Sequence, residues 1–459
     1  MKFSIKNLGA IHDAELDLAN FTVICGKNNS GKTYVTYAIY GFLKLWKNYI
    51  ELPISDILVK NILDNGIGEL DLNDYEKSFK ITLNHASKSY TSIIHRILAS
   101  KEEYFSSTKF SIHFDFPSEV YYSTYKQKIS ARKTNLLIIE KEENSSIVKI
   151  TLGVENEKPS LTTNFLTEIL SQEITSLLFE SIIPTPFIAS AERTGSAIFT
   201  KELFFARNRM LDQINETRGD IDPFKLLSKI YSDYALPVKE NVEFTQRLTK
   251  IRNEKSWLAI NHPDILKFFD QIAGGNYKAT SDEVFFSPKK SGTLKLTMDE
   301  SSSAVRSLVD IGFFLRHQAN KGDILIIDEP ELNLHPENQR MMARLCAKLA
   351  NVGIKIFVTT HSDYFVKEIN TLIMLKGTKD KSDELCKRYG YDIGELLDHN
   401  TLSVYLAHPE KKYIDGLNSK KMVNTLSLCD IDQEEGAQVK SFDESIEIMN
   451  TIQQEILFG

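Results

Sequence analysis

The chain has 459 residues, of which 42% are hydrophobic and 25% charged, and its formal net charge is −7. A chain of this length can bury a large core and is expected to form about two or three domains. No apolar run has the length of a membrane span, and residues 1–6 lack a signal-peptide core, so we expect a cytoplasmic protein without membrane association. The four cysteines are scattered, which excludes a zinc site built from Cys-x-x-Cys pairs.

The first strong motif in chain order is GKNNSGKT at residues 26–33, which follows an apolar run at 21–25 and precedes a helix-like stretch. Glycines at its first and sixth positions let backbone N–H groups form a nest around nucleotide phosphates. We expect Lys32 to reach the β- and γ-phosphates and the Thr33 hydroxyl to ligate Mg²⁺. The alternative is a Gly-rich turn without a ligand. The predicted nucleotide-binding residues are Gly26, Asn28, Asn29, Ser30, Gly31, Lys32 and Thr33.

The pattern between residues 46 and 282 predicts a compact lobe instead of a coiled-coil rod. No heptad repeat is sustained there, and prolines at 184, 186, 223, 237 and 263 would interrupt a long helix. A β-hairpin is predicted from the apolar runs 135–140 and 147–152 around turn residues 143–146. Helical patterns dominate from about 165 to 269. Within this region, Arg193 follows a short strand and is a candidate contact to a phosphate or a subunit boundary; a surface ion pair is the alternative.

Three serines at residues 301–303 precede a predicted helix. The helix buries one apolar face, formed by Val305, Leu308, Val309, Gly312 and Phe313. Serine hydroxyls at a helix N-terminus are good donors to a phosphate, so Ser302 and Ser303 are candidate nucleotide contacts. Ordinary N-capping of the helix is the alternative interpretation.

Residues 324–330, ILIIDEP, are typical of a strand that is buried on both faces and ends in two carboxylates. Ligands of open α/β sheets bind at this end of the strands. We therefore predict that Asp328 holds Mg²⁺ with its water shell and that Glu329 polarises the attacking water as general base. A buried strand that runs into a polar turn is the alternative.

A further strand at 355–360 ends just before His361, after one intervening helix. Pro336 marks the start of that helix and Gly353 its stop. Between them, helical spacing is kept by Met342, Leu345, Cys346 and Leu349. Because a strand–helix–strand crossover places both strands in one parallel sheet, we expect His361 to lie beside Glu329.

The residues from Asp328 to Pro336, DEPELNLHP, together with TTHS at 359–362, resemble the head domain of ABC-type AAA ATPases, in the branch that contains the SMC, Rad50, RecF and OLD proteins. The resemblance implies ATP as substrate and Mg²⁺ as cofactor. It also implies that Glu329 is the catalytic base, that His361 senses the γ-phosphate and that the loop 331–336 communicates across a dimer.

Such heads hydrolyse ATP as face-to-face pairs, in which a signature loop of one subunit caps the nucleotide of the other. The resemblance places Ser302 and Ser303 in that loop, although this chain lacks the glycine pair of the usual Leu-Ser-Gly-Gly motif. A glutamine loop is not placed. The expected assembly is thus a homodimer with composite ATP sites, or a higher oligomer.

The two halves of the nucleotide site are far apart in the chain, so the predicted α/β head is discontinuous. We assign the head to residues 1–90 and 283–375, an insertion to 91–282, and a partner-binding or oligomerisation region to 376–459. OLD-type relatives carry a metal-dependent nuclease domain in the last position. Here Asp430 and Asp432 lie next to Glu434 and Glu435, which indicates an exposed acidic turn, and we expect no nuclease activity of the chain itself.

A compact insertion and the lack of a nuclease domain make the chain similar to the ATPase subunits of two-gene antiphage systems, Septu first and PARIS second. That resemblance implies an ATP-driven switch or scaffold that controls a separate nuclease, of HNH type in Septu, and meets nucleic acid through the complex. The alternatives are a RecF-like repair ATPase that acts as an ATP-dependent dimer on DNA, a transporter-type ATPase, and a self-contained nuclease.

Overall fold

The structure is a computed structural model that describes residues 1–131, 134–153, 162–198, 234–289, 293–378, 381–413, 420–439 and 451–456. The chain folds into two compact units. The smaller unit consists of Met1–Lys2, Phe42–Ser92 and Phe110–Pro184, and the larger of Phe3–Gly41, Ile93–Lys109 and Thr185–Gly459. Helix α1 (Lys32–Leu45) and strand β5 (Lys109–His113) continue from one unit into the other.

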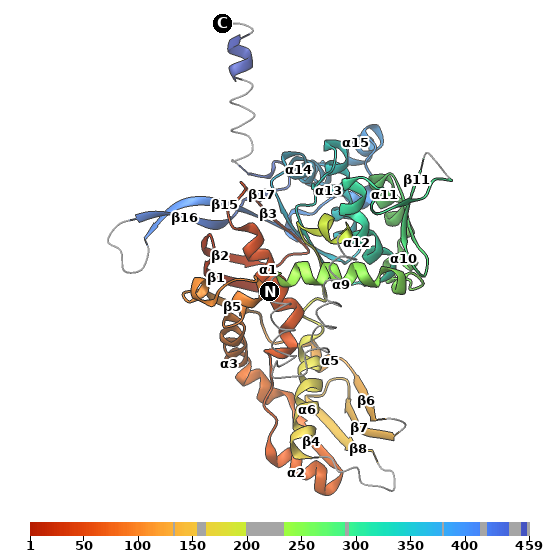
Figure 1. The fold of residues 1–459 in the computed structure, drawn as a ribbon. Coiled ribbons are helices and arrows are strands. Elements are labelled where there is room, and N and C mark those ends of the chain that lie inside the picture. Colours follow the sequence, from red (N-terminus) through yellow and green to blue (C-terminus); the bar gives the residue numbers. More distant parts are fainter. Residues whose placement is uncertain are drawn as a thin grey trace, which may run out of the picture. The chain divides into compact units, whose positions relative to one another are not determined.

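The larger unit is built on a central sheet whose strands in this unit follow the order β1-β2-β16-β15-β3-β14-β13-β9. Figure 1 labels β1, β2, β3, β15 and β16 of this sheet. Strands β15, β3, β14, β13 and β9 run parallel, and β15 and β16 form an antiparallel hairpin. Every residue of β3 and β13 is buried, as their unbroken apolar sequences predict for strands covered on both faces. The bounds are β1 (Lys2–Leu8), β2 (Ile11–Asp17), β3 (Phe21–Gly26), β9 (Pro186–Ala189), β13 (Ile324–Asp328), β14 (Lys355–Thr360), β15 (Leu402–Tyr413) and β16 (Lys420–Leu428).

Two helices of the larger unit, at 303–317 and 336–351, carry the apolar faces that their spacing predicts. The principal helices of the unit are α9 (Leu236–Ile251), α10 (Trp257–Asn261), α11 (Pro263–Ala273), α12 (Ser303–His317), α13 (Pro336–Asn351), α14 (Asp363–Gly377) and α15 (Ser382–Tyr389), with the single turn α4 (Ile94–Ile97). Short 3₁₀ turns are η2 (Glu102–Phe105), η4 (Ile393–Glu395) and η5 (His399–Thr401). Two small antiparallel sheets complete the unit: β10 (Gly275–Ala279), β11 (Val284–Pro288) and β12 (Leu296–Thr297), and β17 (Ile431–Asp432) with β18 (Gly436–Ala437).

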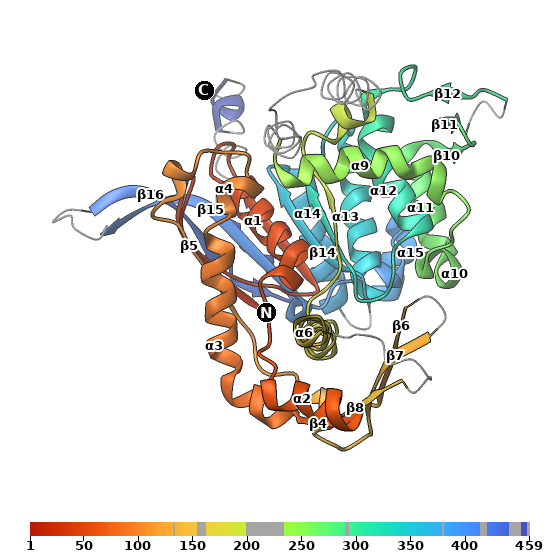
Figure 2. The same cartoon turned by 60° about the horizontal axis from the view of Figure 1, so that its bottom comes forward.

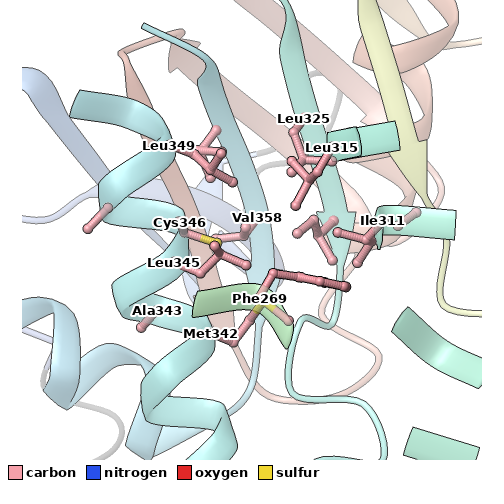
Figure 3. Close-up of a cluster of buried hydrophobic side chains, with 14 of the residues drawn as sticks. Phe269, Ile311, Leu315, Leu325, Met342, Ala343, Leu345, Cys346, Leu349 and Val358 are labelled. Carbon is pink, nitrogen blue, oxygen red and sulfur yellow. The ribbon is translucent and has the colours of Figure 1, made fainter. Parts of the chain in front are cut away.

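The core of the larger unit lies between the central sheet and helices α11, α12 and α13 (Figures 2 and 3). Met342, Leu345, Cys346 and Leu349 form one face of α13 and are each at most 1% exposed, which confirms the predicted helix and its buried stripe. They meet Val358 of β14, while Leu325 of β13 faces Ile311 and Leu315 of α12 (Figure 3). Burial of each such side chain contributes about 1.5–3 kcal/mol. This packing fixes the position of the strand ends described below.

The smaller unit joins helices to a four-stranded antiparallel sheet of order β4-β8-β7-β6. The predicted hairpin is confirmed, since β7 and β8 pair with Glu140 opposite Lys149. The elements are η1 (Trp46–Asn48), α2 (Asp56–Asn65), β4 (Ile67–Asp71), α3 (Leu72–Thr91), α5 (Glu119–Tyr122), β6 (Tyr125–Ala131), β7 (Thr134–Lys141), β8 (Ile147–Leu152) and α6 (Thr163–Phe179).

The units divide at other residues than the boundaries predicted at 90, 282 and 375. Strand β9 belongs to the predicted insertion, yet it pairs with β13 in the central sheet. Strands β15 and β16 belong to the predicted C-terminal region, yet they lie between β3 and β2. Buried strands must pair their N–H and C=O groups on both sides, and distant segments of the chain supply these partners. Within the described part of the chain, no helix is long and apolar enough to cross a membrane.

Candidate nucleotide-binding site

Three loops that the sequence singled out meet at the carboxyl edge of the central sheet. The parallel register places Cys25 of β3 opposite Thr360 of β14, and Asp328 of β13 opposite Thr359 of β14. The loops that follow β3, β13 and β14 therefore start side by side. The loop after β9 joins the same edge, since β9 runs parallel to β13.

The loop at 26–33 requires its glycines. Gly26 has a φ of +147° and Gly31 a φ of +96°, values that residues other than glycine rarely adopt. A Cβ at Gly26 would lie 2.5 Å from the Ala407 carbonyl oxygen, and one at Gly31 would lie 2.6 Å from Cγ1 of Ile11. Asn29 adopts a left-handed φ of +60°. Since α1 begins directly at Lys32, the free N–H groups of its first turn belong to this loop.

Lys32 is folded against its own loop. The residue is 6% exposed, and its ammonium donates to the carbonyl oxygens of Gly26 at 2.8 Å and Lys27 at 2.9 Å. Burial lowers its pKa, while the charges of Glu329, Asp328 and Glu331 raise it. Lys27, Asn28 and Asn29 are exposed, as is Thr33.

Asp328 lies at the end of β13 and is 1% exposed. Its Oδ1 accepts a hydrogen bond from the Thr359 hydroxyl, and its Oδ2 has no partner among the described residues. Burial raises its pKa to about 6, against hydrogen bonds from Thr359 and Thr33 that lower it. The buried hydroxyl of Ser30 also lacks a described partner. A hard divalent cation between Thr33 and Asp328 would suit these oxygen atoms.

The structure places His361 beside Glu329, as the predicted crossover requires. Nδ1 of His361 lies 3.3 Å from Oε1 of Glu329 and 3.2 Å from Oε1 of Glu331. Glu331 is 5% exposed, and its Oε1 also accepts from the main-chain N–H of His361 and from the Thr360 hydroxyl, both at 2.8 Å. Sequence reasoning missed Glu331 as the residue that holds His361. The available signal was its place three residues after Asp328, in the same tight turn.

Arg193 is buried, which contradicts one of the two interpretations drawn from the sequence. It is 1% exposed, so the expected surface ion pair is wrong. Its guanidinium donates four hydrogen bonds to main-chain carbonyls, namely those of Ser190, Ser307, Asp328 and Glu329. The guanidinium therefore holds main chain at the carboxyl edge of the sheet, the proposed catalytic edge, and its contact to a phosphate or a subunit boundary stays a prediction.

The serines before α12 divide their roles. Ser302 caps the helix, because its hydroxyl accepts from the Val305 N–H at 3.3 Å, and Ser301 is buried and donates to the Thr297 carbonyl at 2.7 Å. Ser303 begins the helix and is exposed. The predicted buried face of α12 is confirmed. N-capping is thus present at Ser302, and the exposed Ser302 and Ser303 both stay predicted nucleotide contacts.

Among the described residues, no group of three or more His, Cys, Asp or Glu side chains is placed to hold a metal ion. Mg²⁺ at Thr33 and Asp328 would thus need phosphate oxygens or water to complete its six ligands. Asp432 accepts from the N–H groups of Glu434 at 2.6 Å and Glu435 at 3.1 Å. Asp430 and Asp432 are exposed, which confirms the acidic turn.

Comparison with known proteins gives one family and several distant relatives. A family model described as "AAA ATPase domain" matches residues 1–366. The "OLD nuclease" of Thermus scotoductus is 33% identical over 101 residues, and the match spans 21% of this chain and 19% of that relative. Two solved structures are similar: the Smc head bound to the C-winged helix domain of ScpA (12% identity, TM-score 0.35) and the SMC head domain from Thermotoga maritima (10% identity, TM-score 0.30). Each alignment covers 94% of this chain and 98% of the other.

The family model spans most of the chain, including every loop of the site described above. The chain therefore belongs to the AAA ATPase domain family and is a P-loop ATPase.

Proposed function

We propose that this protein hydrolyses ATP at the carboxyl edge of β3, β13 and β14, with Glu329 as the general base. The observation that supports this most is the accessible Glu329 side chain, which is 28% exposed. The same edge of the sheet carries buried polar atoms without described partners, among them the Ser30 hydroxyl and Oδ2 of Asp328. Buried polar atoms usually have partners in folded proteins. The Ser30 hydroxyl could donate to a bound triphosphate, and the free Asp328 oxygen would suit Mg²⁺ or its water shell.

The residues divide the chemistry in a simple way. The N–H groups of the loop 26–33 and the Lys32 ammonium bind the phosphates. Thr33 and Asp328 would hold Mg²⁺, which supplies positive charge to the β- and γ-oxygens when bound. Glu329 accepts a proton from water while the water oxygen bonds to the γ-phosphorus. The bond between the γ-phosphorus and the oxygen that bridges it to the β-phosphate breaks, which releases ADP and phosphate. His361, held through Nδ1 by Glu331, keeps Nε2 for the γ-phosphate.

We further propose a face-to-face homodimer in which Ser303 of one copy contacts the ATP of the other. Its exposed position at the start of α12 supports this role. ATP bound by both copies would favour the closed pair and so act as a switch. In line with the resemblance to Septu and PARIS, the switch would control a separate nuclease, of HNH type, in antiphage defence, with residues 376–459 as the partner-binding region. A RecF-like repair ATPase on DNA is the alternative.

The test of the catalytic assignment is Glu329→Gln. Loss of the general base should lower turnover by a factor on the order of 10² to 10⁴, while ATP binding is retained and an ATP-bound dimer accumulates in light-scattering chromatography. Glu254→Gln is the matched control, since Glu254 is exposed in the same unit. Turnover by Glu329→Gln at the parent rate, in a preparation in which Lys32→Ala is inactive, would exclude Glu329 as the base.

The nuclease partner is tested separately. The chain would be expressed in its native host with its genomic neighbours, and proteins in a stoichiometric complex would be identified by mass spectrometry. A small nuclease is the expected result. Recombination proteins, or tight salt-dependent DNA binding by the chain alone, would instead favour the repair role.

A further inference from the structure

Arg193 lies where three segments of the larger unit meet. Its Nε donates to the Ser307 carbonyl at 2.9 Å, and one terminal nitrogen donates to the carbonyls of Ser190 at 2.8 Å and Asp328 at 2.7 Å. The other terminal nitrogen donates to the Glu329 carbonyl at 2.7 Å. The guanidinium therefore joins the loop after β9, the end of β13 and helix α12.

These bonds reach Glu329 at a strained position. Its φ of +56° is left-handed, a conformation that costs a residue with a side chain about 1–2 kcal/mol. The peptide on one side is held by the Glu329 N–H, which donates to the Thr359 carbonyl at 3.0 Å, and the Glu329 carbonyl is held by Arg193 at 2.7 Å. Since the backbone direction sets where the carboxylate points, Arg193 helps to aim the proposed base.

The same guanidinium reaches the helix that starts with the candidate trans-acting serine. Ser307 lies one helical turn after Ser303 in α12. Besides accepting from Arg193 through its carbonyl, Ser307 shares its hydroxyl hydrogen between the Ala304 carbonyl at 2.9 Å in α12 and the Leu332 carbonyl at 3.3 Å, in the loop that follows Glu329. Two connections therefore tie the first turns of α12 to the chain on either side of Glu329.

We propose that Arg193 is a positioning residue that couples α12 to Glu329, so that contact of the α12 N-terminus with the nucleotide of a second copy sets the base for hydrolysis. The inference rests on the proposed function of Glu329. Lysine cannot replace Arg193 in this role, because its ammonium lacks the planar fork that spans four carbonyls in fixed directions.

The experiment compares Arg193→Lys, Glu329→Gln and the double variant, with ATP affinity and turnover measured on the full chain. Arg193→Lys should lower kcat by a factor on the order of 10², while ATP affinity changes less than about threefold. If Arg193 acts through Glu329, the double variant should lose no more turnover than Glu329→Gln alone. Arg344→Lys is the control: Arg344 forms an ion pair with Glu395 at 2.9 Å within the same unit.

Multiplied losses in the double variant would overturn the coupling, as would a large loss of ATP affinity with kcat unchanged or an equal loss in Arg344→Lys. If Glu329→Gln itself keeps its turnover, the proposed role of Glu329 as base fails; if only Arg193→Lys keeps it, this inference alone fails. Should Arg193→Lys not fold, Ser307→Ala decides, because it removes the hydroxyl that reaches the Leu332 carbonyl, together with its local bond to the Ala304 carbonyl in α12. It should lower kcat a few-fold at constant ATP affinity, and an unchanged kcat would overturn the proposal.

Discussion

The smaller unit and the catalytic edge of the larger unit are held together by different forces. In the smaller unit, Phe79 packs against Phe114, Phe116 and Phe179, with ring centroids 5.2–5.6 Å apart. At the edge, by contrast, Arg193 and Asp328 are each 1% exposed and are held by hydrogen bonds. Apolar packing stabilises in proportion to buried area, whereas buried polar groups need specific partners. We therefore expect substitutions in the first region to change stability and those in the second to change chemistry.

Unpaired polar atoms make the contrast sharper. Among the described residues, eight have a buried side-chain atom without a partner, and four of them lie at the catalytic edge: Ser30, Ser190, Asp328 and Glu331. The smaller unit contains one, Thr175. Each such atom costs about 1–3 kcal/mol while it stays unpaired. The unpaired atoms at this edge thus lower the free energy of unfolding, and they leave polar groups that a ligand can bind.

The largest effect is expected from Phe79→Ala in the smaller unit. Phe79 is 3% exposed and touches three other rings, so its loss should destabilise that unit by about 3–5 kcal/mol. Denaturant unfolding measures this. ATP affinity of the folded protein should not change, and Tyr122→Ala, at a ring that is 67% exposed, should be neutral. A parallel loss of ATP affinity would break the comparison.

Lys32→Ala tests the other side of the comparison. The ammonium is the one cation inside the loop 26–33 with bonds to the loop carbonyls, and charge-assisted bonds to phosphate are worth about 1.5–3 kcal/mol each. ATP binding should weaken by about a hundredfold in calorimetric titration, with a nearly unchanged melting temperature. Lys267→Ala, at an exposed position of α11, should bind like the parent. Unfolding in place of weaker binding would contradict this assignment.

Asp310→Asn measures what polar burial costs near the site. Asp310 is 1% exposed, and burial raises its pKa to about 7, against a Thr245 hydrogen bond and the Arg193 charge. This pKa lies above the unfolded value of about 4. The carboxyl therefore favours folding below pH 4, and the parent protein loses that stability as the pH rises through 7.

Between pH 5 and pH 8 the Asn variant should gain roughly 2 kcal/mol of stability relative to the parent. Denaturant unfolding at the two pH values tests this, with Asp282→Asn at an exposed loop position as control. A stability difference that does not depend on pH would show that Asp310 stays charged in the folded protein.

Ser303→Glu has the smallest expected effect and separates the composite site from the N-cap. A carboxylate at this exposed position would face the γ-phosphate of the second copy, and like charges repel. Turnover should fall by about tenfold, and the ATP-dependent dimer of the Glu329→Gln background should weaken, while ATP binding by single chains persists. Ser281→Glu, at another exposed position of the unit, is the control. Equal behaviour of the two variants would leave Ser303 without a trans contact.

Local patterns predicted the parts of the site that depend on neighbours in the chain. The two glycines of the loop 26–33 are needed because both adopt positive φ values. The crossover from β13 through α13 to β14 follows from an apolar strand, helical spacing and a second strand, and it is enough to place His361 beside Glu329. The β7–β8 hairpin was predicted for the same reason, since its two runs flank a short turn.

Only the tertiary structure decided which distant segments pair. Strand β9 next to β13, and β15 next to β3, join residues that are more than a hundred positions apart, and no local pattern carries that information. The role of Arg193 follows from this pairing, because it places the guanidinium among carbonyls of three segments. The sequence alone thus predicted the nucleotide-binding loop, whereas the packing of the sheet decided how Glu329, the proposed general base, is held.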